Sequence, residues 1–279
     1  MLEHLNSSPQ KPARVVVIGA AGFVGNAVAA RLEKDGVQVL RIARSQVDLT
    51  ARDAEGKLSA LIKPGDAVVA AAAKAPVKDS AMLVENMIMA RAIVRAVGPA
   101  AHVVNISSDA VYADSDQPLG ESSCAEPGSL HGAMHLAREV MFRAEVKAPI
   151  AILRPTLIYG AADPHNGYGP NRFRRLAAEG KEIVLFGEGE ERRDHVWIGD
   201  VAELAVRVLY RRSTGVLNVA TGTVHSFRQI AERFSKNIKT TQRSGPMPHN
   251  GYRPFDPAAT RRAFPDFRYT PLDEGLKRG

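Results

Sequence analysis

Two histidines one helical turn apart are the residues of this chain best suited to chemistry. His131 and His135 are separated by four positions, and side chains at that spacing lie on the same face of an α-helix. An imidazole exchanges a proton near neutral pH, so the pair could supply a general acid or base. Such a pair can also bind Zn²⁺, but a zinc site needs a further protein ligand, and none follows at a suitable spacing. The spacing therefore favours proton transfer, and no metal site is expected.

A glycine-rich turn lies near the N-terminus, between two predicted elements. The β-branched run over 14–18 predicts a buried strand, and an amphipathic helix is expected over 26–34. The glycines between them let the backbone approach a pyrophosphate, and the helix N-terminus attracts the anion. A strand, a glycine turn and a helix in this order predict a dinucleotide site. The residues expected to bind the cofactor here are Gly19, Gly22, Phe23, Val24 and Gly25.

Beyond this turn, strand patterns alternate with helical patterns along the chain. This alternation predicts an α/β fold with a doubly wound parallel sheet and helices on both faces. After Pro155 the pattern loosens into long loops rich in Gly and Pro, and such loops hold substrate beyond the carboxyl edge of this kind of sheet. Further strands are expected over 37–42, 66–71, 101–107 and 150–154, and further helices over 82–97 and 131–146.

Charge and composition narrow the class of partner. The formal net charge is +7, but Lys and Arg are scattered, and no basic run is interleaved with stacking aromatic residues. A positive field also suits ligands that carry phosphate groups. No stretch is long and apolar enough to span a bilayer, and the polar segment 1–10 lacks the apolar part of a secretory signal. We expect neither nucleic acid nor a membrane as a partner, and the single Cys124 fits a reducing cytoplasm.

Four ordered motifs resemble those of the extended short-chain dehydrogenase/reductases, the NAD-dependent epimerase/dehydratase family. The GxxGxxG spacing from Gly19 is the first, and the segment 103–112 is similar to the family's fourth strand, with its catalytic Ser or Thr at Ser108. The segment 153–160 resembles the strand and loop beside the nicotinamide, and 187–202 resembles the nucleotide-sugar segment. The resemblance covers nearly the whole chain. It implies a Rossmann domain and, since family members mostly act on nucleotide sugars, a substrate of that class.

In place of the family's Tyr-x-x-x-Lys motif, the chain has His131-x-x-x-His135. The segment aligns without a gap. His131 thus stands where the family's Tyr exchanges a proton with the substrate oxygen, and His135 where its Lys lowers the pKa of that Tyr and binds the ribose. The resemblance therefore implies Ser108, His131 and His135 as catalytic residues. Two alternatives stay open: the site binds cofactor without catalysis, or the proton is exchanged by another group among Tyr112, Tyr159, Tyr168 and Asp109.

Cofactor preference is encoded at the end of the second expected strand. Members that use NAD place Asp or Glu there, whereas this chain has Ala43 followed by Arg44. A missing carboxylate removes the repulsion of a 2′-phosphate, and a guanidinium can pair with that phosphate. The sequence therefore predicts NADP(H) in preference to NAD(H). The further cofactor contacts that the resemblance implies are Ser45, Asp48, Leu49, Ala71, Ala72, Ala73, Ser107 and His135.

The resemblance also implies a set of substrate contacts. Arg193 and Arg253 match family arginines that bind the sugar-nucleotide diphosphate, and Asn171 resembles an Asn that bonds the diphosphate or the sugar. Ser108 completes this set. Ala110 follows Asp109 where family dehydratases carry Glu, which counts against a 4,6-dehydratase. The function expected is that of an NADP(H)-dependent oxidoreductase or epimerase acting on a nucleotide-activated sugar at a 4-keto or 4-hydroxyl centre. The alternative is a non-catalytic NADP(H)-binding regulatory or scaffold protein.

The same resemblance suggests a domain organisation. A disordered lead-in is expected over 1–12, an NAD(P)-binding Rossmann domain over 13–160, and a mainly substrate-binding part over 161–279. Within the last part, about 200–236 is expected to pack back on the Rossmann domain. A homodimer is possible through the helices 82–97 and 131–146, which many family members bury against a second copy. The apolar residues of these two helices include Met82, Ile88, Ile93, Met134, Val140 and Met141.

Overall fold

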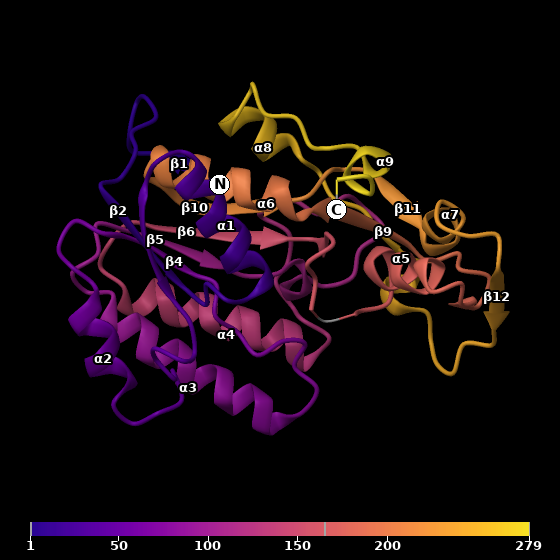
Figure 1. The fold of residues 1–279 in the computed structure, drawn as a ribbon, viewed down its shortest axis with the longest axis horizontal. Coiled ribbons are helices and arrows are strands. Elements are labelled where there is room, and N and C mark those ends of the chain that lie inside the picture. Colours follow the sequence, from indigo (N-terminus) through magenta and orange to yellow (C-terminus); the bar gives the residue numbers. More distant parts are fainter. Residues whose placement is uncertain (1, 165, 279) are drawn as a thin grey trace.

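The computed structural model describes residues 2–164 and 166–278, so Met1, His165 and Gly279 lie outside the description. Over these ranges, a seven-stranded sheet in the order β1-β10-β6-β5-β4-β2-β3 lies between two layers of helices (Figure 1). Every neighbouring pair of strands is parallel except β1 and β10. The predicted α/β fold with a parallel central sheet is confirmed.

The central strands are apolar on both sides because helices cover both faces of the sheet. In β2, Val15 and Val17 face α1, α6 and α8, whereas Val16 and Ile18 face α2, α3 and α4. The expected strands and helices of this part are all present, with ends shifted by a few residues. The strands are β1 (Glu3–His4), β2 (Arg14–Ile18), β3 (Gln38–Ile42), β4 (Ala67–Ala70), β5 (His102–Ile106), β6 (Ile150–Pro155) and β10 (Ser213–Val219). The helices are α1 (Phe23–Lys34), α2 (Ala54–Leu61), α3 (Ser80–Ala96), α4 (Leu130–Glu145), α6 (Ile198–Tyr210) and α8 (Ala258–Ala263).

A smaller unit follows the carboxyl edge of the main sheet, on the right in Figure 1. It has its own apolar cluster, in which Phe173, Leu185 and Phe227 are buried. One of its sheets is built on β9, which pairs with β7, β11 and β13, and β8 pairs with β12. Its strands are β7 (Leu157–Tyr159), β8 (Ile183–Phe186), β9 (Arg192–Trp197), β11 (Val224–Ser226), β12 (Ile238–Thr241) and β13 (Tyr252–Arg253). Its helices are α5 (Pro170–Ala178), α7 (Phe227–Ala231) and α9 (Leu272–Gly275). The chain also has two short 3₁₀ helices: η1 (Asp109–Val111) follows β5 of the main sheet, and η2 (Pro248–Gly251) precedes β13.

Two expectations about organisation differ from the structure. The lead-in over 1–12 is not disordered in its described part, because β1 pairs with Ser213 and Thr214 of β10. The amide of Asn6 also donates to the carbonyl of Arg211. These are backbone contacts at a sheet edge, which a polar composition neither requires nor excludes. The segment 200–236 is divided, since α6 packs on the main sheet and β10 is a strand of it, whereas α7 packs in the smaller unit.

The strand order creates a crevice at one edge of the main sheet. Along the chain, β2 is the first of the parallel strands, and in the sheet it lies between β3 and β4. The chain adds β3 on one side of β2 and then β4 on the other, so the direction of strand order changes at β2. Ligands bind at such a switch point, outside the carboxyl ends of the strands.

None of the helices in the described ranges combines the length and the apolar character that a membrane crossing needs.

Candidate active site

Two adjoining cavities lie at this switch point. The smaller has a volume of about 300 Å³ and the larger about 1050 Å³. Both are lined by Gly22, Ala71 and Ala73, so the ends of β2 and β4 form a common wall. The larger cavity extends from this wall to α4, η1, β9 and η2. A long ligand can therefore lie across both, with one end in each.

The glycine turn between β2 and α1 borders both cavities. Gly19 has φ +88°, and a Cβ added there would lie 2.6 Å from the backbone nitrogen of Ala72. A Cβ at Gly25 would lie 2.2 Å from the carbonyl oxygen of Gly19. Gly22 is the N-cap of α1, without a side-chain cap, and the first turn of the helix has no acidic residue. The helix N-terminus is thus open to an anion, and the turn fits the pyrophosphate of a dinucleotide.

The smaller cavity contains a charged pair at its edge. Arg44 Nη2 lies 3.2 Å from Asp48 Oδ2, and the Arg44 side chain is 76% exposed. Hydrogen bonds from the hydroxyl and amide of Thr50 lower the pKa of Asp48 to about 2. A guanidinium and an ionised carboxylate therefore lie together at the edge of the smaller cavity. Of the predicted contacts, Leu49, Ala71, Ala72 and Ala73 line the cavity, whereas Ser45 is exposed and does not.

His131 and His135 line the larger cavity from the N-terminal part of α4. Their ring centroids are 4.7 Å apart and the ring planes meet at 88°. Neither Nδ1 has a hydrogen-bond partner in the described part of the chain, although both atoms are buried. Burial lowers the pKa of His131, opposed by the nearby Asp109. Burial, with smaller contributions from the neighbouring His131 and Arg138, lowers the pKa of His135 well below its usual value, so this ring is neutral.

η1 presents Ser108 and Asp109 to the same cavity. Ser108 caps η1, because its Oγ accepts a hydrogen bond of 3.2 Å from the amide of Ala110. The N-terminal turn of α4 packs against η1 at Gly132, where a Cβ would lie 2.0 Å from the carbonyl oxygen of Ala110. This close approach brings the helix that carries His131 against the segment that carries Ser108. Ser107, also in the cavity wall, donates to Glu139 at 2.6 Å.

Two further predicted substrate contacts, besides Ser108, lie in the wall of the larger cavity. Arg193, on β9, has one guanidinium nitrogen 3.6 Å from Asp109 Oδ2 and another 3.4 Å from Glu191 Oε1. Asn171, at the start of α5, donates to Asp163 at 2.8 Å and accepts from the amide of Gly160 at 3.0 Å. Both side chains face the cavity while they hold neighbouring segments together.

Arg253 does not line either cavity, contrary to its predicted substrate contact. Its side chain is 1% exposed. The guanidinium donates to the carboxylates of Asp109 and Asp114 and to the carbonyl oxygens of Asp109 and Tyr112. This arginine therefore joins β13 to the segment around η1, and its hydrogen-bonding capacity is used within the chain.

The alternative proton donors differ in their access to the cavity. Tyr112 lines it, but its hydroxyl donates to Asn218 at 2.7 Å, and burial raises its pKa. Tyr168 also lines it, and its hydroxyl accepts from the amide of Phe186. Tyr159 lies outside the wall, where burial raises its pKa. Asp109 lines the cavity but is bonded to Arg253, so His131 is the titratable group of this set that has access without such a bond.

Three polar residues at or near the site have no motif in the sequence to reveal them. His249 and Asp114 line the larger cavity and contact each other, although they are 135 positions apart. Arg138 is fully buried behind the wall, where Nη1 donates to the carbonyl of Ala72 at 2.6 Å. The only sequence signal for any of them is that His249 lies in a turn-rich segment close to Arg253.

Comparison with known proteins identifies the family. Residues 15–220, most of the chain, match the NAD dependent epimerase/dehydratase family. The chain belongs to this family. The resemblance drawn from the motifs is therefore confirmed at that level.

Relatives and solved structures agree with this assignment. The chain is 27% identical to the UDP-glucose 4-epimerase of Mycolicibacterium smegmatis over 252 residues, 78% of this chain and 80% of that protein. It is 28% identical to the dTDP-D-glucose 4,6-dehydratase of Mus musculus over 143 residues, which span 50% of this chain but only 40% of that protein. The structure of a UDP-glucose 4-epimerase from Thermotoga maritima with UDP-glucose has a TM-score of 0.83 at 20% identity, covering 95% of this chain and 96% of that one. At this identity the structural likeness concerns the fold.

Proposed function

We propose that this family member is an NADP(H)-dependent oxidoreductase or epimerase that acts on a nucleotide-activated sugar at a 4-keto or 4-hydroxyl centre. The observation that carries the proposal is the continuity of the two cavities. They join the glycine turn at Gly22 to a polar pocket that contains Ser108, His131 and Arg193. The names of the relatives point to the same class of substrate, since they include enzymes of UDP- and dTDP-sugars.

The cofactor would lie across the common wall. Gly19, Gly22 and the N-terminus of α1 would hold its pyrophosphate, and Ser107 and His135 would lie near its reactive end. When bound, the nicotinamide exchanges a hydride with a carbon of the substrate. Arg44 supports the preference for NADP(H), because a guanidinium can pair with a 2′-phosphate. Asp48 limits that preference, because its carboxylate already pairs with Arg44.

His131 is the proposed proton-transfer group. Its ring is neutral near neutral pH, so it can accept the proton of a sugar hydroxyl as the carbon is oxidised and return it when the carbonyl is reduced. Ser108 would donate a hydrogen bond to the same oxygen. His135 cannot supply the positive charge of a lysine, because its pKa is well below the usual value. That depressed pKa is the observation that favours the alternative, a non-catalytic NADP(H)-binding regulatory or scaffold protein.

We also propose a homodimer in the cytoplasm. On α3 and α4, Val84, Ile88 and Val140 are exposed at 58%, 37% and 55%. Ile93 and Met134, named with this surface from the sequence, are instead buried in the chain's own core. The exposed side chains would be covered by a second copy. The cytoplasm is proposed because the single Cys124 is exposed and suits a reducing compartment.

A thermal-shift panel tests the proposed function. UDP-, GDP-, CDP- and dTDP-sugars are added to the protein with NADP⁺ present, because a ligand that binds the native state raises its Tm. We expect NADP⁺ alone to raise the Tm and one group of nucleotide sugars to raise it further. A shift with NADP⁺ but with none of the sugars would favour the binding protein. No shift with either NADP⁺ or NAD⁺ would contradict both the enzyme and the binding protein.

A further inference from the structure

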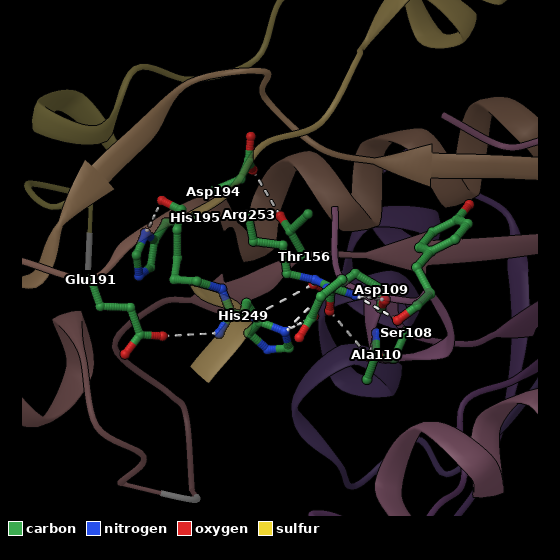
Figure 2. A network of polar contacts seen from close by, with 12 residues as sticks. Ser108, Asp109, Ala110, Thr156, Glu191, Asp194, His195, His249 and Arg253 are labelled. Atoms are coloured by element: carbon green, nitrogen blue, oxygen red, sulfur yellow. Dashed lines mark hydrogen bonds and ion pairs between the residues drawn. The ribbon is translucent and has the colours of Figure 1, made fainter. Parts of the chain in front are cut away.

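A further imidazole, outside α4, lines the larger cavity. His249 belongs to η2 and lines the cavity together with Asp114 and Arg193. His249 Nδ1 contacts Asp114 Oδ1, and Figure 2 shows the ring close to the Ser108–Asp109 segment. The polar wall of the cavity therefore continues from η1 to η2, and His249 is part of it.

The contacts of Nδ1 determine where the ring carries its proton. Two groups approach this atom: Asp114 Oδ1, and Arg253 Nη1 at 3.1 Å. A carboxylate only accepts hydrogen bonds, so its contact with His249 requires a hydrogen on Nδ1. Arg253 Nη1 lies closer to Asp114 Oδ1, at 2.8 Å, and donates there. In the neutral ring, Nε2 is then the atom without a hydrogen, and it can accept a hydrogen bond.

Burial, together with the charges around it, favours the neutral form of the His249 ring. The groups that face it are Asp114, Arg193 on β9 and Arg253 on β13. Burial and the two arginines lower the pKa of His249, and the contact with Asp114 opposes them without reversing the direction. Asp109 and Asp114 in turn offset Arg193 and Arg253, with which they form ion pairs. A corner with balanced charges suits a neutral polar group better than a further phosphate.

The backbone at this position is strained. His249 has φ 52° and Asn250 has φ 49°, which is the left-handed region, and Gly251 follows with φ 75°. Residues other than glycine adopt this conformation uncommonly, because their Cβ comes close to the following carbonyl oxygen. Such strain concentrates where a side chain must be held in a particular place. Here the held side chain is an imidazole in the wall of the cavity.

We propose that His249 is a sugar-binding residue, whose Nε2 accepts a hydrogen bond from a hydroxyl group of the substrate. Asp114 is its positioning residue, because it holds the hydrogen on Nδ1 and leaves Nε2 as the acceptor. That the ligand is a sugar rests on the proposed function. The position of the hydrogen on the His249 ring does not, because it follows from the contacts of Nδ1. The proposal adds a contact from η2 to those expected from α4, so residues of two different elements would hold the substrate's sugar.

The first test needs no ligand. In protein labelled with ¹⁵N-histidine, we expect the His249 ring at neutral pH to be uncharged and to carry its hydrogen on Nδ1, with His249→Asn used to assign the signal. Asp114→Asn should move that hydrogen to Nε2, because the amide can donate to Nδ1. A charged ring, or a hydrogen on Nε2 in the unmodified protein, would overturn the proposal whether or not the protein is an enzyme.

The second test compares two substitutions of His249 in the NADP⁺-bound protein, with UDP-glucose and dTDP-glucose as probes. Asn reaches the position of Nδ1 but offers no acceptor at that of Nε2, whereas Gln places its carbonyl oxygen there. We expect His249→Asn to raise the Kd of the bound sugar nucleotide by roughly 10-fold to 100-fold and His249→Gln to raise it much less. NADP⁺ affinity and Tm, measured on both variants, should stay close to those of the unmodified protein.

The pH dependence separates hydrogen bonding from a structural role. As the pH falls from about 8 to about 5, protonation removes the acceptor at Nε2, so binding should weaken in the unmodified protein and not in His249→Gln. Equal sugar affinity in the unmodified protein and both variants would overturn the proposal. If neither probe binds the unmodified protein, the proposed substrate class fails, and the ring state measured by ¹⁵N decides the inference on His249 by itself.

Discussion

His131 lines the larger cavity with a neutral ring, because burial lowers its pKa. It can therefore accept a proton at neutral pH, and it shares the cavity with Ser108, the partner expected for the substrate oxygen. The other candidates are bonded elsewhere: the Tyr112 hydroxyl to Asn218, and Asp109 to Arg253. All three groups line the cavity, and His131 differs from the other two because its Nδ1 has no hydrogen-bond partner within the described residues.

Replacing His131 by Ala should lower kcat by roughly 10²–10⁴-fold, because the proton would then have no general acid or base. The Kd of NADPH, measured by isothermal titration, should change little. His225→Ala is the matched control, since His225 lies on β11 and lines neither cavity. Full turnover by His131→Ala on the true substrate would rule out the histidine mechanism and make Tyr112 and Tyr168 the next candidates.

Arg44 is the residue that should set cofactor preference. Replacing it by Ala should reduce the preference for NADPH over NADH by about 1.5–3 kcal/mol, the value of a hydrogen bond to a charged group. The lower part of this range is expected, because the side chain is exposed and already paired with Asp48. Titration of both cofactors measures the effect, with the exposed Arg52→Ala as control. Equal affinity of the unmodified protein for NADPH and NADH would contradict the role of Arg44.

At the scale of elements, the contact between α4 and η1 positions the catalytic candidates. Ser129 caps α4, and its Oγ accepts from the amide of Gly132 at 3.1 Å. Because Gly132 has no side chain, α4 can approach the carbonyl of Ala110. The distance between the elements that carry His131 and Ser108 thus depends on one glycine.

Gly132→Ala should destabilise the fold by about 1–3 kcal/mol, because the new Cβ would overlap the carbonyl oxygen of Ala110 and force the two elements apart. Gly56→Ala is the matched control. Gly56 is an exposed residue of α2 with open space at its Cβ position, so the same substitution should stabilise by up to about 1 kcal/mol. Urea unfolding measures both. A Gly132→Ala variant as stable as the control would show that the contact with η1 is not close.

At the scale of the whole molecule, buried histidines make stability depend on pH. Burial lowers the pKa of His102 to about 4 and that of His195 to about 3. Between these values and the unfolded pKa of 6.5, the unfolded chain binds more protons than the folded one, so stability falls as the pH falls. The raised pKa of buried Asp194 and Asp200 acts in the opposite sense, at pH values below those raised pKa values.

We expect the free energy of unfolding to decrease from about pH 6.5 downward, with each of these two histidines contributing a loss of about 2 kcal/mol by pH 5. Urea unfolding at a series of pH values measures the slope. His102→Gln keeps a donor for the carbonyl of Ser213, which accepts from His102 Nε2 at 2.6 Å, but does not titrate. This variant should lose less stability on acidification. An identical slope for both proteins would mean that His102 is not held neutral.

Assembly is the second property of the whole molecule that can be tested. If Val84, Ile88 and Val140 are covered by a second copy, light scattering at micromolar concentration should give twice the mass of one chain. Val84→Lys with Val140→Lys would place charges in that contact and should give the mass of one chain. Val184→Lys, an equally apolar exposed site on β8, serves as control. A single-chain mass for the unmodified protein would contradict the dimer.

Features that depend on neighbours along the chain could be predicted from residue types and spacing. The strand, the glycine turn and the helix that form the cofactor site are contiguous over 14–34, so composition and spacing were enough to predict them. The shared helical face of His131 and His135 follows from a separation of four residues. The parallel sheet follows from the alternation of strand and helix patterns, which leaves few other arrangements.

Features that depend on burial and on distant partners could not be predicted in this way, because they arise when the chain folds. Arg253 matched a substrate-binding arginine in the sequence, but ion pairs with Asp109 and Asp114 across the fold hold it in the interior. His249 meets Asp114 across 135 positions, and no local pattern links the two. The neutral state of His135 has the same origin, because its depressed pKa comes from desolvation, and the water around a side chain is removed by whichever elements pack against it.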